Sequence, residues 1–195
     1  MDRPVQIVAV AGSNRRGSLN RLLLERAVEA LGEQPEASVH VVDLRDHPLP
    51  LYDADQHAAE GIPPEAVALH ERFTAADAVV FANPEYNGGY PALWKNAIDW
   101  VSRIDMLFLH PRYVGLLSAS PGKTGGVRGI EHTRALLANM FVPTHPEAFP
   151  VARAHEALTA DGFADPADGA RLRDWAAGFV RAARAHAEER DARAA

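Results

Sequence analysis

The feature that most constrains the fold is an apolar run at residues 77–82, which a glycine-containing loop and a helix-like stretch follow directly. β-Branched and aromatic residues crowd the run and Pro84 closes it, which is typical of a strand buried in a parallel sheet. Asn87, Gly88 and Gly89 permit tight turns, and Pro91 can begin a helix because its missing N–H would have no partner there. The segment therefore predicts a strand, a pinned loop and a helix.

The same order of strand, loop and helix occurs twice more. Residues 5–11 form an apolar run that breaks at Gly12, and residues 113–118 form another that ends in the glycine-rich stretch 119–126. Helical spacing of apolar residues follows each loop. Further elements are predicted at 39–44 (strand), 63–76 and 91–102 (helices), 127–140 (helix), 141–152 (a Pro-interrupted edge strand) and from Gly169 onward (helix), with a frayed tail after His186.

Composition limits the possible functions. The chain has 195 residues, of which 47% are hydrophobic and 24% charged, so we expect one globular domain spanning residues 1–195. The net charge of -6 argues against a nucleic-acid partner, because phosphate backbones are bound through clustered Lys and Arg. The chain has no cysteine, so redox chemistry would need a bound cofactor.

The sequence also predicts the compartment of the protein and whether it binds a metal. Residues 1–4 lead straight into a short apolar strand, and no apolar segment of about 20 residues occurs, so we expect a cytoplasmic protein without a membrane partner. The nine histidines form no HExxH motif, and we predict no metal site. Asp53 and Asp55 are interpreted as turn formers rather than metal ligands.

The loop at residues 12–20 has two interpretations. A helix N-terminus with Ser13, Ser18 and Asn20 beside it, and Arg15 for charge, could bind one phosphate. The same residues could simply cap the helix through Ser18 and leave Arg15 in solvent. Spacing alone does not separate these interpretations.

Other nucleotide and hydrolase patterns are not met. Residues 122–124 look like the end of a Walker A loop, but Leu117 stands where that pattern needs its first glycine. No GxSxG motif surrounds Ser118 or Ser120, so a serine hydrolase has no support.

Three motifs resemble one family. Pro84-Glu85-Tyr86-Asn87, then Pro91 and the stretch 95–100, are similar to the isoalloxazine-binding segment of the NADPH-dependent FMN reductase family. The loop at 12–20 resembles the phosphate loop of that family, and residues 118–126 resemble its segment beside the flavin ring. The family usually has Ser, Gly and Leu where this chain has Gly89, Ala92 and Trp94.

The resemblance implies a flavodoxin-like α/β fold, a three-layer sandwich around a five-stranded parallel sheet of order 2-1-3-4-5. It implies an enzyme that carries FMN, takes a hydride from NADPH or NADH and reduces a small acceptor: a quinone, an azo or nitro compound, a metal oxyanion or free flavin. The implied FMN-binding residues are Ser13, Arg15, Ser18, Leu19, Asn20, Pro84, Glu85, Tyr86, Asn87, Gly88, Ser118, Ser120, Pro121 and Gly122.

Several alternatives stay open. No catalytic side chain is needed, because the flavin carries the chemistry, although Glu85 as a general acid is a second possibility. The chain could instead be a flavin-binding carrier or redox sensor without turnover, or a flavin-free lyase or hydrolase. The family is commonly dimeric or tetrameric. The apolar connector 104–111 packs on its own domain, forms a subunit contact or forms a rim over the flavin, and Met106 to Leu109 with Trp94 are the candidates for the contact.

Overall fold

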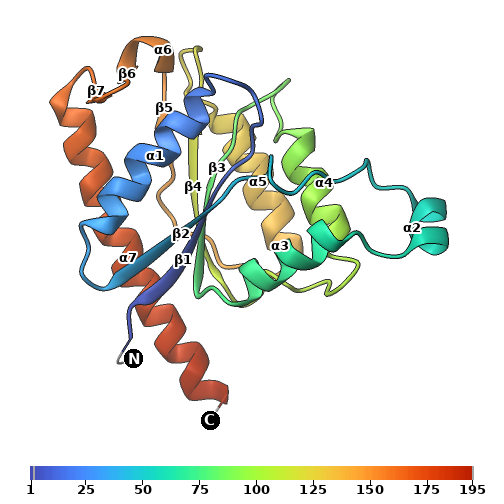
Figure 1. Ribbon diagram of the computed structural model, residues 1–195. Helices are drawn as coiled ribbons and strands as arrows, with labels where there is room; N and C mark the ends of the chain where they lie inside the picture. The colour runs from blue at the N-terminus through green and yellow to red at the C-terminus, as the bar shows by residue number, and fades with distance from the viewer. Residues whose placement is uncertain (2, 195) are drawn as a thin grey trace.

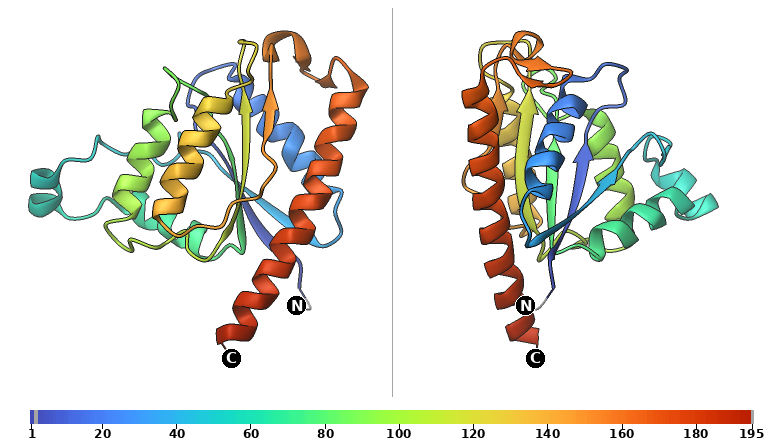
Figure 2. Two further views of the ribbon diagram at one scale, coloured as in Figure 1. Left: turned by 180° about the vertical axis from the view of Figure 1, so that it is seen from behind. Right: turned by 60° about the vertical axis from the view of Figure 1, so that its left-hand side comes forward.

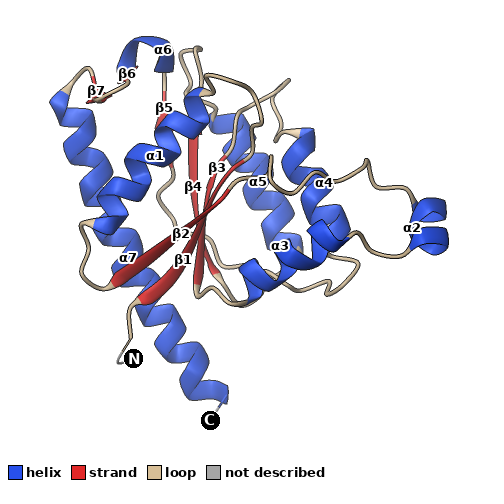
Figure 3. Cartoon of the chain, viewed as in Figure 1, coloured by secondary structure: helices blue, strands red, loops and turns tan. Residues whose placement is uncertain are grey.

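Five parallel strands form the central sheet, in the order β2-β1-β3-β4-β5 (Figures 1 and 3). The structure is a computed structural model that describes residues 1 and 3–194. The strands are β1 (Val5–Ala11), β2 (Ala37–Val42), β3 (Ala78–Ala82), β4 (Tyr113–Ala119) and β5 (Phe149–Val151). The predicted flavodoxin-like order is thereby confirmed.

Helices cover both faces of this sheet (Figure 2). One face carries α1 (Leu19–Gly32) and α7 (Pro166–Ala194), and the other carries α3 (Pro64–Thr74), α4 (Ala92–Val101) and α5 (Val127–Asn139). The short elements α6 (Ala154–Ala157), β6 (Leu158–Thr159) and β7 (Gly162–Phe163) lie between β5 and α7. The three-layer arrangement predicted from the alternation of elements is confirmed.

The alternating direction of side chains along each strand builds two cores. In β1, Ile7 and Ala9 pack with α1 and α7, whereas Val8 and Val10 pack with the helices of the opposite face. Every residue of β3 is buried, as expected of a central parallel strand covered on both sides. Because helices cover both faces of the sheet, polar groups can gather only at the ends of the strands.

The edge strands differ from their predicted bounds. β2 spans Ala37–Val42 rather than the predicted 39–44. The strand is only partly buried, so no clear apolar run in the sequence marks where it begins and ends. The interrupted edge strand at 141–152 is reduced to β5 and one isolated bridge between Val114 and Thr144. Proline at 143, 146 and 150 removes N–H donors, which confirms the edge position.

Between β2 and α3, where the sequence pattern predicts neither a strand nor a helix, lies a further helix, α2 (Ala54–Glu60), which projects from the body of the protein (Figure 1). The Asp53 carboxylate caps it by accepting hydrogen bonds from the N–H groups of Asp55 and Gln56. This confirms a local structural role for Asp53. The side chains of Asn96 and Trp100 on α4 donate to the Pro50 carbonyl at 2.9 and 2.8 Å, and so fix the start of the arm.

The predicted fraying after His186 is wrong, because α7 continues to Ala194. Its Arg190 Nη2 donates to Asp77 Oδ1 at 2.9 Å, and Arg3 Nη2 donates to the same oxygen at 2.8 Å. The Gln6 N–H donates to Asp77 Oδ2 at 2.9 Å. The Asp77 side chain is only 2% exposed, so these contacts tie the last turns of α7 to the amino-terminal edge of the sheet.

The apolar connector at 104–111 packs mainly on its own domain. Phe108 and Leu109 are fully buried, and Trp94 is only 1% exposed and packs edge-on against Phe81. The expectation that these three residues form a subunit contact is therefore wrong, since they are part of the core. Met106 and Leu107 remain exposed, at 60% and 38%.

We predict that Arg190→Ala lowers the free energy of unfolding by about 1–3 kcal/mol, because it removes a charge-assisted hydrogen bond from a buried carboxylate. Urea denaturation measures the effect. Arg193→Ala is the matched control, since Arg193 lies on the same helix and pairs with Glu189 at the exposed surface. Equal losses in both variants would contradict the role given to Arg190.

The same carboxylate predicts a dependence on acid. Burial alone raises the pKa of Asp77, but hydrogen bonds from Arg3, the Gln6 N–H and Arg190 outweigh it and set the pKa at about 2, below the ordinary 3.8. Protons therefore bind more readily to the unfolded state. Stability from the ionised carboxylate should be present above about pH 4 and be lost as the pH falls toward 2. Urea denaturation at several pH values in this range should show the free energy of unfolding falling less steeply with pH in Arg190→Ala than in the wild type. Identical slopes in the two proteins would contradict the role given to Asp77.

Candidate functional site

Three loops meet in a pocket of about 180 Å³ at the carboxyl ends of β1, β3 and β4. In a doubly wound sheet, ligands bind at this edge, where the strand order reverses. The pocket is lined by Ser13, Arg15, Ser18, Leu19, Asn20, Pro84, Glu85, Tyr86, Ala119, Ser120 and Pro121. Residues from all three predicted loops are thus brought together.

The loop after β1 presents the open N-terminus of α1. Ser18 is the N-cap, and its hydroxyl oxygen accepts a hydrogen bond from the Arg21 N–H at 3.4 Å. The first turn of α1 carries no acidic residue, whereas α2 has Asp55 and α3 has Glu65 in their first turns. The first N–H groups of a helix have no intrahelical acceptor, so this end of α1 suits an external anion.

Arg15 supplies a positive charge beside that helix end. The side chain is exposed, lines the pocket, and has its Nη2 at 3.5 Å from the Gly17 carbonyl oxygen. Ser13 is buried, and its Oγ accepts from the Arg15 N–H at 3.4 Å. Gly17 has φ of 64°, a conformation that favours glycine and lets the loop turn into α1. Capping by Ser18 is therefore confirmed, and it leaves Arg15 exposed beside the helix end.

Asn20 has a role that the sequence did not reveal. Its Nδ2 donates to the Ala119 carbonyl at 2.8 Å, and its Oδ1 accepts from the Ala119 N–H at 2.9 Å. The side chain is 3% exposed. The amide thus joins the first turn of α1 to the end of β4, across 99 residues of sequence, and fixes one loop relative to another.

The loop after β3 is closed by a tight hairpin turn. Asn87 and Gly88 have φ of 53° and 78°, and Tyr86 and Gly89 exchange two N–H···O bonds of 3.0 Å each. Positive φ at both central residues is the geometry that Asn-Gly favours, which confirms the turn predicted there. The turn leaves Tyr86 52% exposed at the mouth of the pocket.

Glu85 is directed toward α5 by a hydrogen bond. Its Oε2 accepts from the Gly129 N–H at 3.1 Å, in the first turn of that helix. A Cβ at Gly129 would lie 3.2 Å from Glu85 Cβ, so the two segments pack closely. The carboxylate therefore occupies the N-terminus of α5, while the N-terminus of α1 has no acidic side chain in its first turn.

The loop after β4 packs against the start of α5. Gly126 is the N-cap of α5 with φ of 85°, and a Cβ there would lie 2.0 Å from Ser118 Oγ. Ser118 is fully buried, and its Oγ has no hydrogen-bond partner among the described residues. The backbone at Gly126 therefore lies directly against Ser118, where no larger residue would fit.

Some predicted residues do not line the pocket: Asn87, Gly88, Ser118 and Gly122. Asn87 and Gly88 shape the turn, and the Gly122 N–H donates to Ser120 Oγ at 3.1 Å. Ala119 lines the pocket but was not predicted, because an alanine at the end of a strand carries no sequence signal of binding. The roles assigned to the individual site residues stay predictions.

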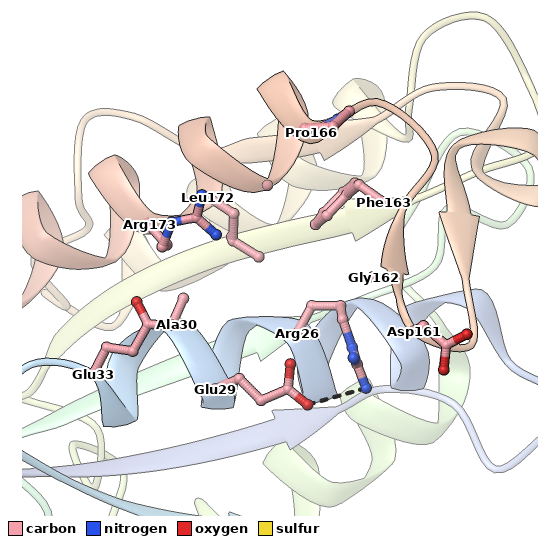
Figure 4. A pocket seen from close by; sticks show the side chains of 11 residues that line it. Arg26, Glu29, Ala30, Glu33, Asp161, Gly162, Phe163, Pro166, Leu172 and Arg173 are labelled. Atoms are coloured by element: carbon pink, nitrogen blue, oxygen red, sulfur yellow. Dashed lines mark ion pairs between the residues drawn. The ribbon is translucent and has the colours of Figure 1, made fainter.

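A second pocket, of about 290 Å³, lies between α1 and α7 beside the β6–β7 hairpin (Figure 4). Arg26 there pairs with Glu29 at 3.1 Å, and Glu33, Asp161 and Arg173 add further charges. None of the predicted site residues lines it, and it shares no lining residue with the pocket at the strand ends. It is distinct from the pocket formed by the three loops.

Neither a metal cluster nor a membrane-spanning helix occurs within residues 1 and 3–194. No group of three or more His, Asp or Glu side chains there is arranged to hold a metal ion. No helix in that part of the chain is long and apolar enough to cross a membrane.

The pocket fits a ligand with one phosphate and a flat, partly apolar body. The open end of α1 and Arg15 suit the phosphate, while Pro84, Tyr86 and Pro121 offer flat surfaces. Its volume of about 180 Å³ is below the ~300 Å³ of small closed ligand pockets, so part of a ligand as large as FMN would remain at the surface. Fold and site together define a flavodoxin-like mononucleotide-binding protein.

Comparison with known proteins identifies the family. The sequence model of the NADPH-dependent FMN reductase family matches residues 5–156. An NAD(P)H-dependent FMN reductase of Pseudomonas aeruginosa is 34% identical over 165 residues, 83% of this chain and 85% of that protein. A quinone reductase of Escherichia coli K12 is 38% identical over 150 residues, 75% of this chain and 78% of that protein. The chain belongs to the NADPH-dependent FMN reductase family.

A solved structure agrees with this assignment. The flavoenzyme NAD(P)H:(acceptor) oxidoreductase of Paracoccus denitrificans superposes with a TM-score of 0.75 at 27% identity, covering 93% of this chain and 98% of that one. The resemblance noted in the three loops thus extends to the whole fold.

We predict that Arg15→Ala weakens FMN binding by about 1–3 kcal/mol, because the variant loses a charged donor beside the phosphate. Quenching of flavin fluorescence during titration of the apoprotein measures the dissociation constant. Arg16→Ala is the matched control, since Arg16 is exposed in the same loop but does not line the pocket. Unchanged affinity in Arg15→Ala would contradict the proposed phosphate site.

Proposed function

We propose that the protein is an FMN-dependent NAD(P)H oxidoreductase that reduces a small-molecule acceptor. The observation that carries the proposal is the meeting of three loops around the open N-terminus of α1, in a chain of the FMN reductase family. Bound FMN supplies the redox chemistry, accepting a hydride and passing electrons on. The protein contributes binding and orientation.

The first loop would hold the phosphate of FMN. Ser13 and Arg15 offer side-chain donors, and Ser18, Leu19 and Asn20 present the first turn of α1. The Asn20 side-chain amide is bonded twice to Ala119, so it acts by fixing the loop and leaves only its backbone N–H, in the first turn of α1, for the phosphate. The helix end and Arg15 therefore carry the anion recognition.

The other two loops would hold the flavin ring. Residues 84–88 provide Pro84 and Tyr86 as surfaces, with Asn87 and Gly88 setting the turn that presents them. Ser120 and Pro121 line the opposite wall, where the Gly122 N–H donates to Ser120 Oγ, and the buried Ser118 lies in the strand before them. A ring held between two rigid turns is oriented before the donor arrives, which lowers the entropy cost of reaction.

The geometry does not favour Glu85 as a general acid. Its Oε2 accepts a hydrogen bond from the Gly129 N–H at the start of α5. The carboxylate is therefore already engaged by that helix. We therefore propose that Glu85 joins the second loop to α5 and that no side chain of the pocket transfers a proton.

The acceptor we propose is a quinone or free flavin, with azo and nitro compounds and metal oxyanions as further candidates. The relatives' names, an FMN reductase and a quinone reductase, support the first two. A flat acceptor also suits the exposed Tyr86 at the mouth of the pocket.

We further propose that the chain acts as a single domain in the cytoplasm and assembles as a homodimer or homotetramer. Met106 and Leu107 support the assembly because they are large, apolar and exposed. Phe141, 72% exposed, lies close to them, since its carbonyl contacts His110 Nδ1 at 2.7 Å and the His110 N–H bonds Leu107 O at 2.7 Å. These three side chains form the proposed subunit contact.

Steady-state kinetics test the proposed function. Protein loaded with FMN should oxidise NADPH or NADH many times per flavin when a quinone is present. A carrier or redox sensor would retain the yellow flavin but consume little nucleotide, and a flavin-free lyase or hydrolase would purify colourless and bind no added FMN. Either of those two results would reject the oxidoreductase.

We predict that Leu107→Glu lowers the molar mass in solution, because a carboxylate placed in an apolar contact is desolvated without a partner. Multi-angle light scattering after gel filtration measures the mass. Leu51→Glu, on the projecting arm and 80% exposed, is the control and should leave it unchanged. If Leu107→Glu keeps the wild-type mass, the proposed contact is incorrect.

A further inference from the structure

The second pocket of the protein is formed by residues 26–33 of α1, 161–163 of the β6–β7 hairpin and 166–173 of α7. We call it the interhelix pocket. Figure 4 shows residues of α1 along one wall and residues of α7 along the other, with the hairpin closing one end. Its volume of about 290 Å³ exceeds that of the pocket at the strand ends and is close to the ~300 Å³ of small ligand pockets. The space therefore suits a small molecule.

The floor of the interhelix pocket is apolar. Ala30 on α1 and Leu172 on α7 are 4% and 2% exposed and belong to the core on this face of the sheet. Phe163 of the hairpin packs partly buried against the same core, and its ring points into the pocket (Figure 4). An apolar or aromatic group of a ligand would be removed from water on this floor.

Charges of both signs surround the floor. Arg26 and Glu29 form an ion pair at 3.1 Å, and the buried Arg26 Nε still has no acceptor among the described side chains and backbone. Arg173, Glu33 and Asp161 are exposed, and no ion pair within residues 1 and 3–194 includes any of them. The carboxylates disfavour a polyanion such as a nucleotide, whereas a ligand that carries both signs is complementary to this lining.

Gly169 marks the point at which the cation and the aromatic ring meet. A Cβ on Gly169 would lie 3.8 Å from Arg173 Nη1 and 3.8 Å from Phe163 Cδ2, which is ordinary van der Waals contact with each. A charged donor and a flat apolar surface therefore border the same open space. An α-amino acid carries a carboxylate and a side chain on one carbon atom, so these two groups could contact the guanidinium and the ring together.

We infer that the interhelix pocket binds a free α-amino acid with an apolar or aromatic side chain. The carboxylate of the ligand accepts hydrogen bonds from the Arg173 guanidinium, and its ammonium group lies against the carboxylate of Asp161 or Glu33. Its side chain rests on the Phe163 ring. The inference does not depend on the proposed function, because the interhelix pocket shares no lining residue with the pocket at the strand ends.

The ligand should need all three of its groups. The charged side chains of the pocket are exposed, so a single ion pair contributes little. L-Phenylalanine should therefore bind with a dissociation constant in the millimolar range. Glycine lacks the apolar side chain, N-acetyl-L-phenylalanine lacks the ammonium group and phenethylamine lacks the carboxylate, and each should bind about tenfold more weakly or not at all.

An NMR titration of the purified protein with L-phenylalanine tests the inference. The amide signals of residues 161–163 and 169–173 should shift and reach saturation. Gly169→Leu should abolish this binding, because the leucine side chain enters the open space, and the helix should tolerate leucine better than glycine. Gly178→Leu is the matched control, since Gly178 lies on the same helix but does not line the pocket, and it should bind as the wild type does.

A second variant tests the role of the cation. Arg173→Ala should weaken the binding of L-phenylalanine about tenfold and leave that of phenethylamine unchanged, because only the first ligand has a carboxylate. Any of three results would overturn the inference: amide shifts that do not saturate or that lie outside the pocket, equal affinity for L-phenylalanine and its N-acetyl derivative, or unchanged binding in Gly169→Leu.

Discussion

Burial of the central strands on both faces is the constraint on which the structure depends. β3 has no exposed residue, and β1 and β4 are nearly as buried, so helices must cover the sheet on both sides. Polar chemistry is then confined to the two edges where strands begin and end.

The two edges are used differently. At the amino-terminal edge the Asp77 carboxylate is held by Arg3, Arg190 and the Gln6 N–H, whereas at the carboxyl-terminal edge Ser118 Oγ and the Asn83 amide are buried without partners among the described residues. One edge secures the fold, and the other retains polar groups that the fold does not satisfy, as functional sites often do.

The helix N-termini at the carboxyl-terminal edge show the same division of roles. α5 receives the carboxylate of Glu85 through the Gly129 N–H, and this contact fixes the loop that presents Tyr86. α1 receives only its own N-cap Ser18 and has no acid in its first turn. The protein thus fills one positive helix end with its own anion and keeps acids out of the first turn of the other, the end at which we propose that the phosphate binds. The Asn20 amide, bonded twice to Ala119, keeps that open end in register with β4. The proposed recognition relies mostly on the placement of backbone groups, which agrees with the few charged side chains that line the pocket.

The pocket at the strand ends combines one positive charge with flat apolar surfaces. Arg15 is the cationic side chain that lines it, together with Pro84, Tyr86 and Pro121. Membership of the NADPH-dependent FMN reductase family and the arrangement of the loops agree on a protein whose own groups bind and orient while the flavin reacts.

The sequence by itself determined the alternation of strands and helices, the three loops and the family, because hydrophobic periodicity, Gly-Pro punctuation and short motifs are local signals. It also located the Asn87-Gly88 turn, whose positive φ values those residue types favour. Tertiary structure decided the rest. The bonds of Asn20 to Ala119 and of Arg190 to Asp77 join residues 99 and 113 positions apart, and no local pattern announces them. Burial likewise assigned Trp94 to the core and left Met106 at the surface, since an apolar side chain has the same sequence signature in both places. Local sequence signals thus determine the helices, strands and turns, and contacts between distant segments determine which side chains remain available for binding.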